Sequence, residues 1–412
     1  MKPIYLYNLM LRAAIGGIGA LAVLPGPSFV LAQSSPIPGR PALVAAADKG
    51  HLSEVLALLK KTTARKELGA ALGAATYNNH ADVVKALLKA GADANSQDFM
   101  PGFPVVSEAA NMGAIDVLQL LLNAGANPNV PDSANKKTAI FWATHSHNAN
   151  ILRALLRAGA DARARDAAGA TPLIEAVDWG GSPDMVGILI KAGADLNAEA
   201  KNHVTAWRQA LAKGSGDIIT ALIAAGANPK GDDKGKDGPF DPRKFQFNGY
   251  DGRAPLMTCA LMGRGECVNA LLQAGVDANQ KHWDGGTKGF TALMMAAQSG
   301  GMDVIEALLK GGADPNLMNE RGNTALMSAA FGGHIGVIKA LFHAGAKLDV
   351  QNEMGASSLM LAVIGGHDDA VQALLQAGAR VDLKNSKGQT AEVLANKYLD
   401  PAILAALKAA NH

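Results

Sequence analysis

Cysteine and aromatic residues are scarce in this chain. Only two of the 412 residues are cysteines, Cys259 and Cys267. A lipoprotein is excluded, because a lipid-acceptor cysteine is needed near the N-terminus and none lies there. Phenylalanine, tryptophan and tyrosine together make up 5% of the residues, whereas glycine alone fills 46 positions. We expect helices that pack closely through small side chains rather than around a large aromatic core.

The chain also lacks an excess of charge of either sign. Its formal net charge is +2, and removal of residues 1–32, which hold Lys2 and Arg12 and no acid, leaves zero (+2 − 2 = 0). A nucleic-acid-binding surface needs a basic excess on one face, so no nucleic-acid partner is expected. No glycine-rich phosphate loop and no nucleophile elbow occurs in the sequence. The sequence therefore predicts neither an enzyme nor a cofactor, and it offers no catalytic or metal-binding residue.

A long apolar run is missing as well. Residues 13–24 are apolar for about 12 positions, whereas a membrane-spanning helix needs roughly 20. This run follows the positive residues Lys2 and Arg12, and a small-residue cleavage site at residues 30–32 precedes Gln33. The pattern favours a cleaved export signal over a membrane anchor. We expect a periplasmic or secreted protein with no membrane contact after cleavage.

The chain contains many copies of one short sequence motif. It reads Ala-Gly-Ala-Asp-x-Asn at Ala90–Asn95 and returns with small variations. Its glycine stands at Gly91, Gly125, Gly159, Gly193, Gly226, Gly275, Gly312, Gly345 and Gly378. The spacings between successive glycines of this series are 34, 34, 34, 33, 49, 37, 33 and 33 residues. A period near 33 is typical of stacked-repeat proteins, which offer a long binding face.

The unit Glu320–Asn352 indicates what each repeat contains. Thr324 stands where a helix N-cap belongs, in front of a first helix predicted over 325–332. A second helix is predicted over 335–344, and Gly345 ends it by adopting the left-handed conformation. The side chains expected to face inward on the second helix are Val337, Ile338, Leu341 and Phe342.

These units resemble the ankyrin repeat, a turn followed by two antiparallel helices that starts with Thr-Pro-Leu-His-x-Ala. The matching starts are Thr171-Pro172-Leu173, Ala254-Pro255-Leu256, Thr291-Ala292-Leu293 and Thr324-Ala325-Leu326. The resemblance covers the chain from about Pro41 to the C-terminus, with partial units at 41–61 and 386–411 as caps. It implies an all-α solenoid of about eleven helix-turn-helix units, including caps, with short β-turn or hairpin fingers.

One departure from the family pattern concerns the histidine of the start motif. Methionine takes its place at Met257, Met294, Met327 and Met360. Thioethers are soft ligands for Cu(I). Successive units stack about 8–10 Å apart, however, so one methionine per unit cannot converge on an ion. We interpret these residues as adaptable core filler.

The two long steps mark insertions, and insertions in such arrays fall on the side that meets partners. The first spans Gly231–Tyr250 and the second leads through Trp283 towards Phe290. Together with the face that the resemblance makes concave, they give the partner-binding candidates Phe240, Phe245, Phe247, Tyr250, Trp283, Phe290, Trp179, Phe331, Arg253 and Arg321. Exposed aromatic clusters favour partner contact. The same rings can instead fold back and cover a gap in the stack, and the sequence leaves both interpretations open.

The two cysteines share one unit. Cys259 lies in its predicted first helix and Cys267 in its second. The helices are antiparallel, so a disulfide is feasible in an oxidising compartment. Two buried thiols that fill space fit the sequence as well.

We divide the chain into an export signal (1–32), a linker (33–40), a first repeat block (41–230), an inserted loop (231–250) and a second repeat block (251–412). The function that the sequence favours is an exported scaffold, adaptor or inhibitor, that holds another protein through the concave face and the aromatic insertions. The alternatives are a secreted effector that binds a host protein and a periplasmic metal or ligand sensor.

Overall fold

The described part of the chain is helical throughout. In this computed structural model it comprises residues 41–61, 64–201, 204–227, 255–281, 289–398 and 401–410. Those ranges contain 22 helices and no strand. None of these helices has the length and apolar character needed to cross a membrane. The predicted export signal and the inserted loop 231–250 lie outside the described residues.

The helices form pairs, one pair for each expected unit. In order they are α2 (Ala42–Asp48) with α3 (Leu52–Leu59), α4 (Arg65–Tyr77) with α5 (Ala81–Lys89), α6 (Val105–Asn111) with α7 (Ile115–Asn123), α8 (Ala139–His145) with α9 (Ala149–Arg157), α10 (Pro172–Asp178) with α11 (Pro183–Lys191), α12 (Ala206–Lys213) with α13 (Gly216–Ala224), α14 (Pro255–Leu261) with α15 (Gly265–Gln273), α16 (Ala292–Ser299) with α17 (Met302–Lys310), α18 (Ala325–Gly332) with α19 (Ile335–His343), α20 (Ser358–Gly365) with α21 (Asp368–Gln376), and α22 (Ala391–Tyr398) with α23 (Pro401–Ala409).

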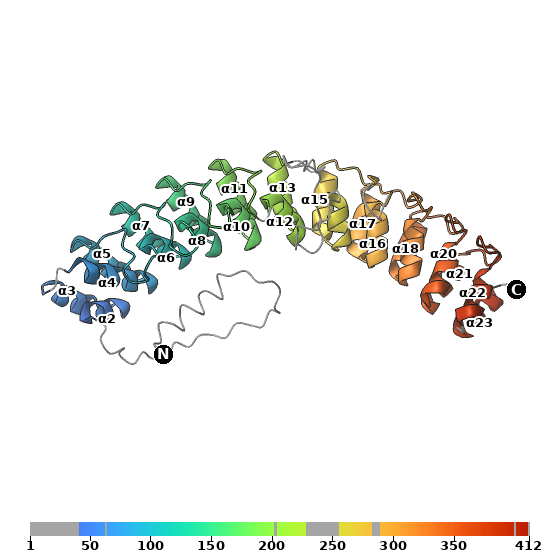
Figure 1. Cartoon of the computed structure of the whole chain (residues 1–412), viewed down its shortest axis with the longest axis horizontal. Helices are drawn as coiled ribbons and strands as arrows, with labels where there is room; N and C mark the ends of the chain where they lie inside the picture. Colours follow the sequence, from blue (N-terminus) through green and yellow to red (C-terminus); the bar gives the residue numbers. More distant parts are fainter. Residues whose placement is uncertain are drawn as a thin grey trace. The chain divides into compact units, whose positions relative to one another are not determined.

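The pairs stack side by side into two layers. Each first helix contacts the first helix of the next pair, and each second helix contacts the next second helix, from α2 to α23 (Figure 1). The two helices of every pair also contact each other. The expected all-α solenoid of helix-turn-helix units is confirmed.

Small and branched side chains fill the space between the layers. In α18 and α19, Ala329, Ala330 and Leu341 are fully buried. The expectation that Phe342 faces inward is wrong, because its side chain is 40% exposed. Val337, Ile338 and Leu341 form the buried stripe of α19. Phe342 lies about 90° around the helix from the middle of that stripe, at 3.6 residues per turn.

The predicted start and end signals of the repeat are confirmed. The Thr324 hydroxyl accepts a hydrogen bond from the backbone N–H of Met327 at 3.3 Å, which makes Thr324 the N-cap of α18. Gly345 follows α19 with a φ of 85°, the left-handed conformation that glycine adopts without a steric penalty.

Where the connections between pairs are described, a turn joins one pair to the next, and we call these turns fingers. Inside a finger, the Asn319 N–H donates to the Asn323 carbonyl at 3.0 Å, so the chain reverses direction within five residues. Neighbouring fingers are also joined, since the Glu353 N–H donates to the Arg321 carbonyl at 3.1 Å. These two neighbouring fingers are therefore held together by a backbone hydrogen bond.

Three histidines at the start of second helices each join their own unit to the one before it. The Nε2 atoms of His80, His334 and His367 lie 3.1, 3.0 and 3.0 Å from the carbonyl oxygens of Asp48, Gln298 and Phe331. Each of these carbonyls belongs to the first helix of the preceding unit or to its last turn. The histidines hold the stacking register between units.

Candidate functional site

The residues that the sequence selects for partner binding fall into two groups. Phe290, Trp179, Phe331 and Arg321 belong to the described residues. Phe240, Phe245, Phe247, Tyr250, Arg253 and Trp283 lie outside them. The face between the fingers and the first helices, called the inner face here, carries the four that are described.

A groove of about 770 Å³ opens on the inner face near its C-terminal end. It spans three units, from the finger before α16 to helix α20. The residues that line it are Phe290, Gln298, Arg321, Asn323, Met327, Ser328, Phe331, Asn352, Glu353, Met354 and Leu361. The structure thus brings Phe290, Arg321 and Phe331 together in one hollow. Trp179 does not line it.

The groove has an apolar centre that water reaches. The Phe331 side chain on α18 is 53% exposed, and Met354 in the next finger is 69% exposed. Large apolar side chains gathered in an exposed hollow are typical of interaction sites. Arg321 and Glu353, on neighbouring fingers, supply one charge of each sign at the same groove.

Sequence reasoning selected Phe331 but missed Met354. The available signal was the finger sequence Asn352-Glu353-Met354-Gly355, in which an apolar residue stands at a turn where polar residues are usual. Leu361 on α20 was also missed, because a leucine at helical spacing is ordinarily a core residue.

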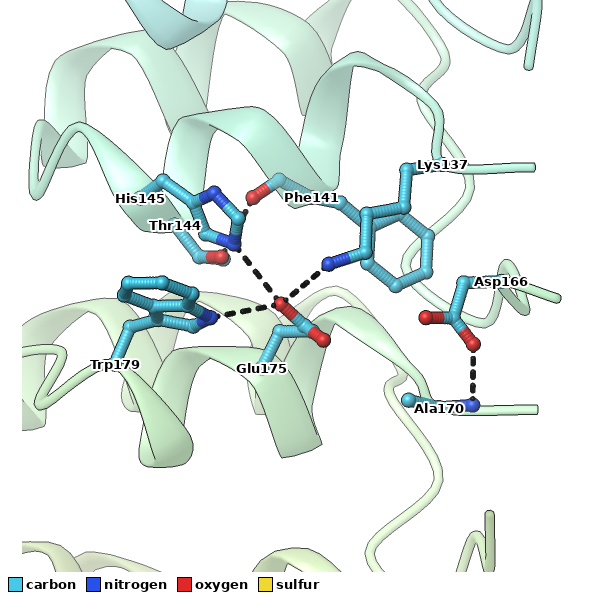
Figure 2. Close-up of polar contacts among 8 residues, drawn as sticks. All are labelled: Lys137, Phe141, Thr144, His145, Asp166, Ala170, Glu175 and Trp179. Atoms are coloured by element: carbon cyan, nitrogen blue, oxygen red, sulfur yellow. Dashed lines mark hydrogen bonds and ion pairs between the residues drawn. The ribbon is translucent and has the colours of Figure 1, made fainter. Parts of the chain in front are cut away.

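A second concentration of side chains lies on the inner face of α8 and α10, around Glu175 (Figure 2). Its Oε2 atom accepts hydrogen bonds from Lys137 Nζ at 2.9 Å, from His145 Nε2 at 2.9 Å and from Trp179 Nε1 at 3.1 Å. Lys137 comes from the finger before α8, and His145 lies at the end of α8. Glu175 lies in α10, and Trp179 is the C-cap of that helix. One carboxylate thus fastens a finger and two successive first helices.

Burial and hydrogen bonding act in opposite directions on the pKa of Glu175. Burial raises it, while the hydrogen bond from His145 and the positive charge of Lys137 lower it, and the net pKa lies below its usual value. The carboxylate is therefore ionised, as three donors on one oxygen require.

Aromatic rings extend from this cluster along the inner face. Ring centroids lie 5.1 Å apart for Phe103 and Trp142, 5.2 Å for Trp142 and His145, and 4.5 Å for His145 and Trp179. These four residues form an aromatic strip across successive units. Trp179 ends it with 48% of its side chain exposed, and its ring is held by His145 and Glu175. A ring fixed in this way presents contact area at little cost in side-chain entropy.

Glu108 on α6 has no such partners. It is 2% exposed, and its Oε1 atom is buried without a hydrogen-bond partner among the described residues. Burial raises its pKa to about 8. Glu108 is therefore protonated and uncharged at neutral pH, unlike Glu175.

Cys259 on α14 and Cys267 on α15 are joined by a disulfide, and both are fully buried. Their Cα atoms lie 5.9 Å apart, within the usual range for such bonds. Within the described ranges, no group of three histidine, cysteine, aspartate or glutamate side chains is arranged to hold a metal ion.

Comparison with known families agrees with this architecture. A family model described as "Ankyrin repeats (3 copies)" matches residues 13–98, 106–200, 281–352 and 333–408, and one described as "Ankyrin repeat" matches residues 251–283. The first of these matches overlaps the predicted export signal. No curated protein matches the chain. The matches cover well over half of the 412 residues, and the chain belongs to the ankyrin repeat family.

Proposed function

We propose that this chain is an exported scaffold that holds a partner protein in the groove of its inner face. Ankyrin repeats are generally protein-interaction scaffolds and typically non-enzymatic. The role is that of an adaptor or an inhibitor, which acts by occupying a surface of its partner and needs no cofactor.

The groove is the observation that carries this proposal. It combines exposed apolar area at Phe331 and Met354 with charged groups at Arg321 and Glu353. An apolar centre with a polar rim is the usual anatomy of a protein interface. Aromatic side chains in the middle of such a patch commonly contribute most of the binding energy.

The proposal is tested by partner capture from a periplasmic extract and from culture supernatant with the purified chain. Phe331→Ala removes the groove's central ring and is expected to abolish capture. Phe342→Ala is the matched control, because Phe342 has the same side chain, lies in the same unit and is 40% exposed, but does not line the groove. Equal losses in both variants, or in neither, would contradict the proposal.

A third variant, Phe245→Ala with Phe247→Ala and Trp283→Ala, tests the inserted segments in the same experiment. If capture is lost with this variant and not with Phe331→Ala, the partner binds the insertions instead of the groove. Loss with this variant and with Phe331→Ala means that both surfaces take part.

Export is a separate part of the proposal and rests on residues 1–32. Their positive start, short apolar run and small-residue site before Gln33 support a cleaved signal. Fractionation of producing cells, followed by N-terminal sequencing, tests it. We expect a mature chain that begins at Gln33 in the periplasm or the medium. A cytosolic chain that still carries residues 1–32 would contradict export.

A further inference from the structure

We infer that the groove receives an extended peptide segment of the partner, which carries a large apolar residue with an acidic and a basic residue close to it in the sequence. This inference rests on the proposed function, because it names the kind of partner surface that the same groove accepts.

The apolar residue is required by the centre of the groove. Met327 and Phe331 on α18, Met354 on the next finger and Leu361 on α20 all border it. Met327 is buried, whereas Phe331 and Met354 are among the most exposed large apolar side chains described. A single aliphatic or aromatic side chain that enters between them removes this area from water.

The acidic and the basic residue of the segment are inferred from the charges on two neighbouring fingers. Arg321 and Glu353 both border the groove, and no ion pair or side-chain hydrogen bond holds either charged group among the described residues. Elsewhere, charges of successive units pair with each other, as Arg153 does with Asp184 at 2.7 Å. Two unpaired and opposite charges at one apolar hollow match a segment that carries both signs.

The two charged residues stand close together on paired fingers. The Glu353 N–H donates to the Arg321 carbonyl at 3.1 Å, so the backbones of these residues are adjacent. An extended chain advances about 3.3 Å per residue, so the acidic and basic residues that face Arg321 and Glu353 are expected within a few positions of each other. Gln298 adds an exposed amide at the same groove for the backbone of the segment.

Peptide selection tests the inference on the full chain. A displayed library of random linear 12-residue peptides is selected separately on the unmodified protein, on Arg321→Glu, on Glu353→Arg and on Phe331→Ala, with Phe342→Ala as the control. The substituted charges are exposed, so the variants are expected to fold normally. Far-ultraviolet circular dichroism checks this.

Each variant has its own expected outcome. The unmodified protein and Phe342→Ala should enrich peptides with the acidic, apolar and basic residues in close succession. Arg321→Glu should enrich peptides with two basic residues, and Glu353→Arg peptides with two acidic residues. Each mismatch should weaken a synthetic peptide about two- to fivefold. Phe331→Ala should weaken every selected peptide about tenfold or more.

Three outcomes would overturn the inference. The first is enrichment of peptides whose charges do not follow the substitutions. The second is the absence of any enriched peptide while Phe331 remains necessary for partner capture, which leaves the proposed function standing with a folded surface as the occupant. The third is self-association of the chain that Phe331→Ala abolishes, measured by sedimentation, which makes a second copy the occupant. If neither peptides nor a partner depend on Phe331, the proposed function fails as well.

Discussion

Two glutamates at the same position of the repeat have opposite protonation states. Glu108 and Glu175 each stand four residues after the N-cap of a first helix, Pro104 in α6 and Thr171 in α10. Glu175 meets Lys137, His145 and Trp179, while Glu108 has a buried oxygen without a partner among the described residues. A buried carboxyl group keeps its charge only where donors replace the lost water.

Glu108 gives the first prediction, a fall in stability as the pH rises. Its pKa is about 8 in the folded chain, against 4.5 for a glutamate in water, so between these values the folded chain keeps a proton that the unfolded chain has lost. The contribution of Glu108 to the free energy of unfolding should therefore be highest below about pH 4.5 and fall as the pH rises through 8. The total fall is on the order of 4–5 kcal/mol.

Glu108→Gln is the variant that checks this prediction, by urea unfolding at pH 5 and pH 8. Glutamine has nearly the same shape and no charge, so the variant should lose this fall and be the more stable protein at pH 8. Glu306→Gln, at an exposed position of α17, is the control and should keep the slope. A slope that survives Glu108→Gln would show that another group causes it.

At the scale of the element, one hydroxyl caps the start of first helix α18. Thr324→Ala removes the acceptor of the Met327 N–H and should lower the free energy of unfolding by about 1 kcal/mol. Thr324→Ser keeps the hydroxyl and should retain most of the stability. Chemical denaturation compares the two variants. Equal losses would assign the effect to the missing methyl group instead of the cap.

The pair α14 and α15 carries the second prediction at this scale. The denatured and unreduced protein should have no free thiol, and reduction should release those of Cys259 and Cys267. The closed loop is short, so reduction should destabilise the protein by only about 2–3 kcal/mol. Thiol titration in denaturant shows whether the disulfide is formed. Two free thiols before reduction would mean that the residues only fill space in solution.

The sequence predicts the elements far better than the site. The first helix was expected over 325–332 and α18 has those bounds, and α19 ends at His343, one residue before the expected end. Local signals such as Thr324 and Gly345 suffice for this. Phe342 was misplaced, because its burial depends on what the neighbouring units cover.

The groove and the Glu175 cluster required the structure for the same reason. Met354 borders the groove only because its finger pairs with the one before it, through Glu353 and Arg321. Glu108 and Glu175 look alike in the sequence, and two of the three donors to Glu175, Lys137 and His145, come from the preceding unit. Contacts between units join residues far apart in the sequence, and the sequence of one repeat does not reveal them.

At the scale of the whole molecule, we predict that residues 33–230 and 251–412 unfold as separable blocks. The stability of an array is a sum of unit terms and neighbour terms, and the 49-residue step between Gly226 and Gly275 interrupts the series of regular units here. Helices α13 and α15 contact each other across this junction. Hydrogen exchange in increasing urea, read by mass spectrometry for each half, should give two midpoints. One midpoint shared by both halves would contradict the division.

A pair of glycine variants sharpens this experiment. A Cβ atom at Gly216 of α13 would stand 2.8 Å from the Glu266 carbonyl oxygen of α15, so Gly216→Ala should weaken the junction and separate the two midpoints further. A Cβ at Gly187 of α11 meets nothing within 4 Å. Gly187→Ala should therefore leave the separation unchanged, since it lies in a helix and adds only helix propensity.

The central claim, that the inner-face groove holds a partner protein, is tested most directly by one ratio of affinities. With the captured partner in hand, calorimetric titration gives its Kd for the unmodified chain, for Phe331→Ala and for Phe342→Ala. We predict a Kd at least about tenfold higher for Phe331→Ala and unchanged for Phe342→Ala. An unchanged Kd for Phe331→Ala, or an equal rise in both variants, would contradict the claim.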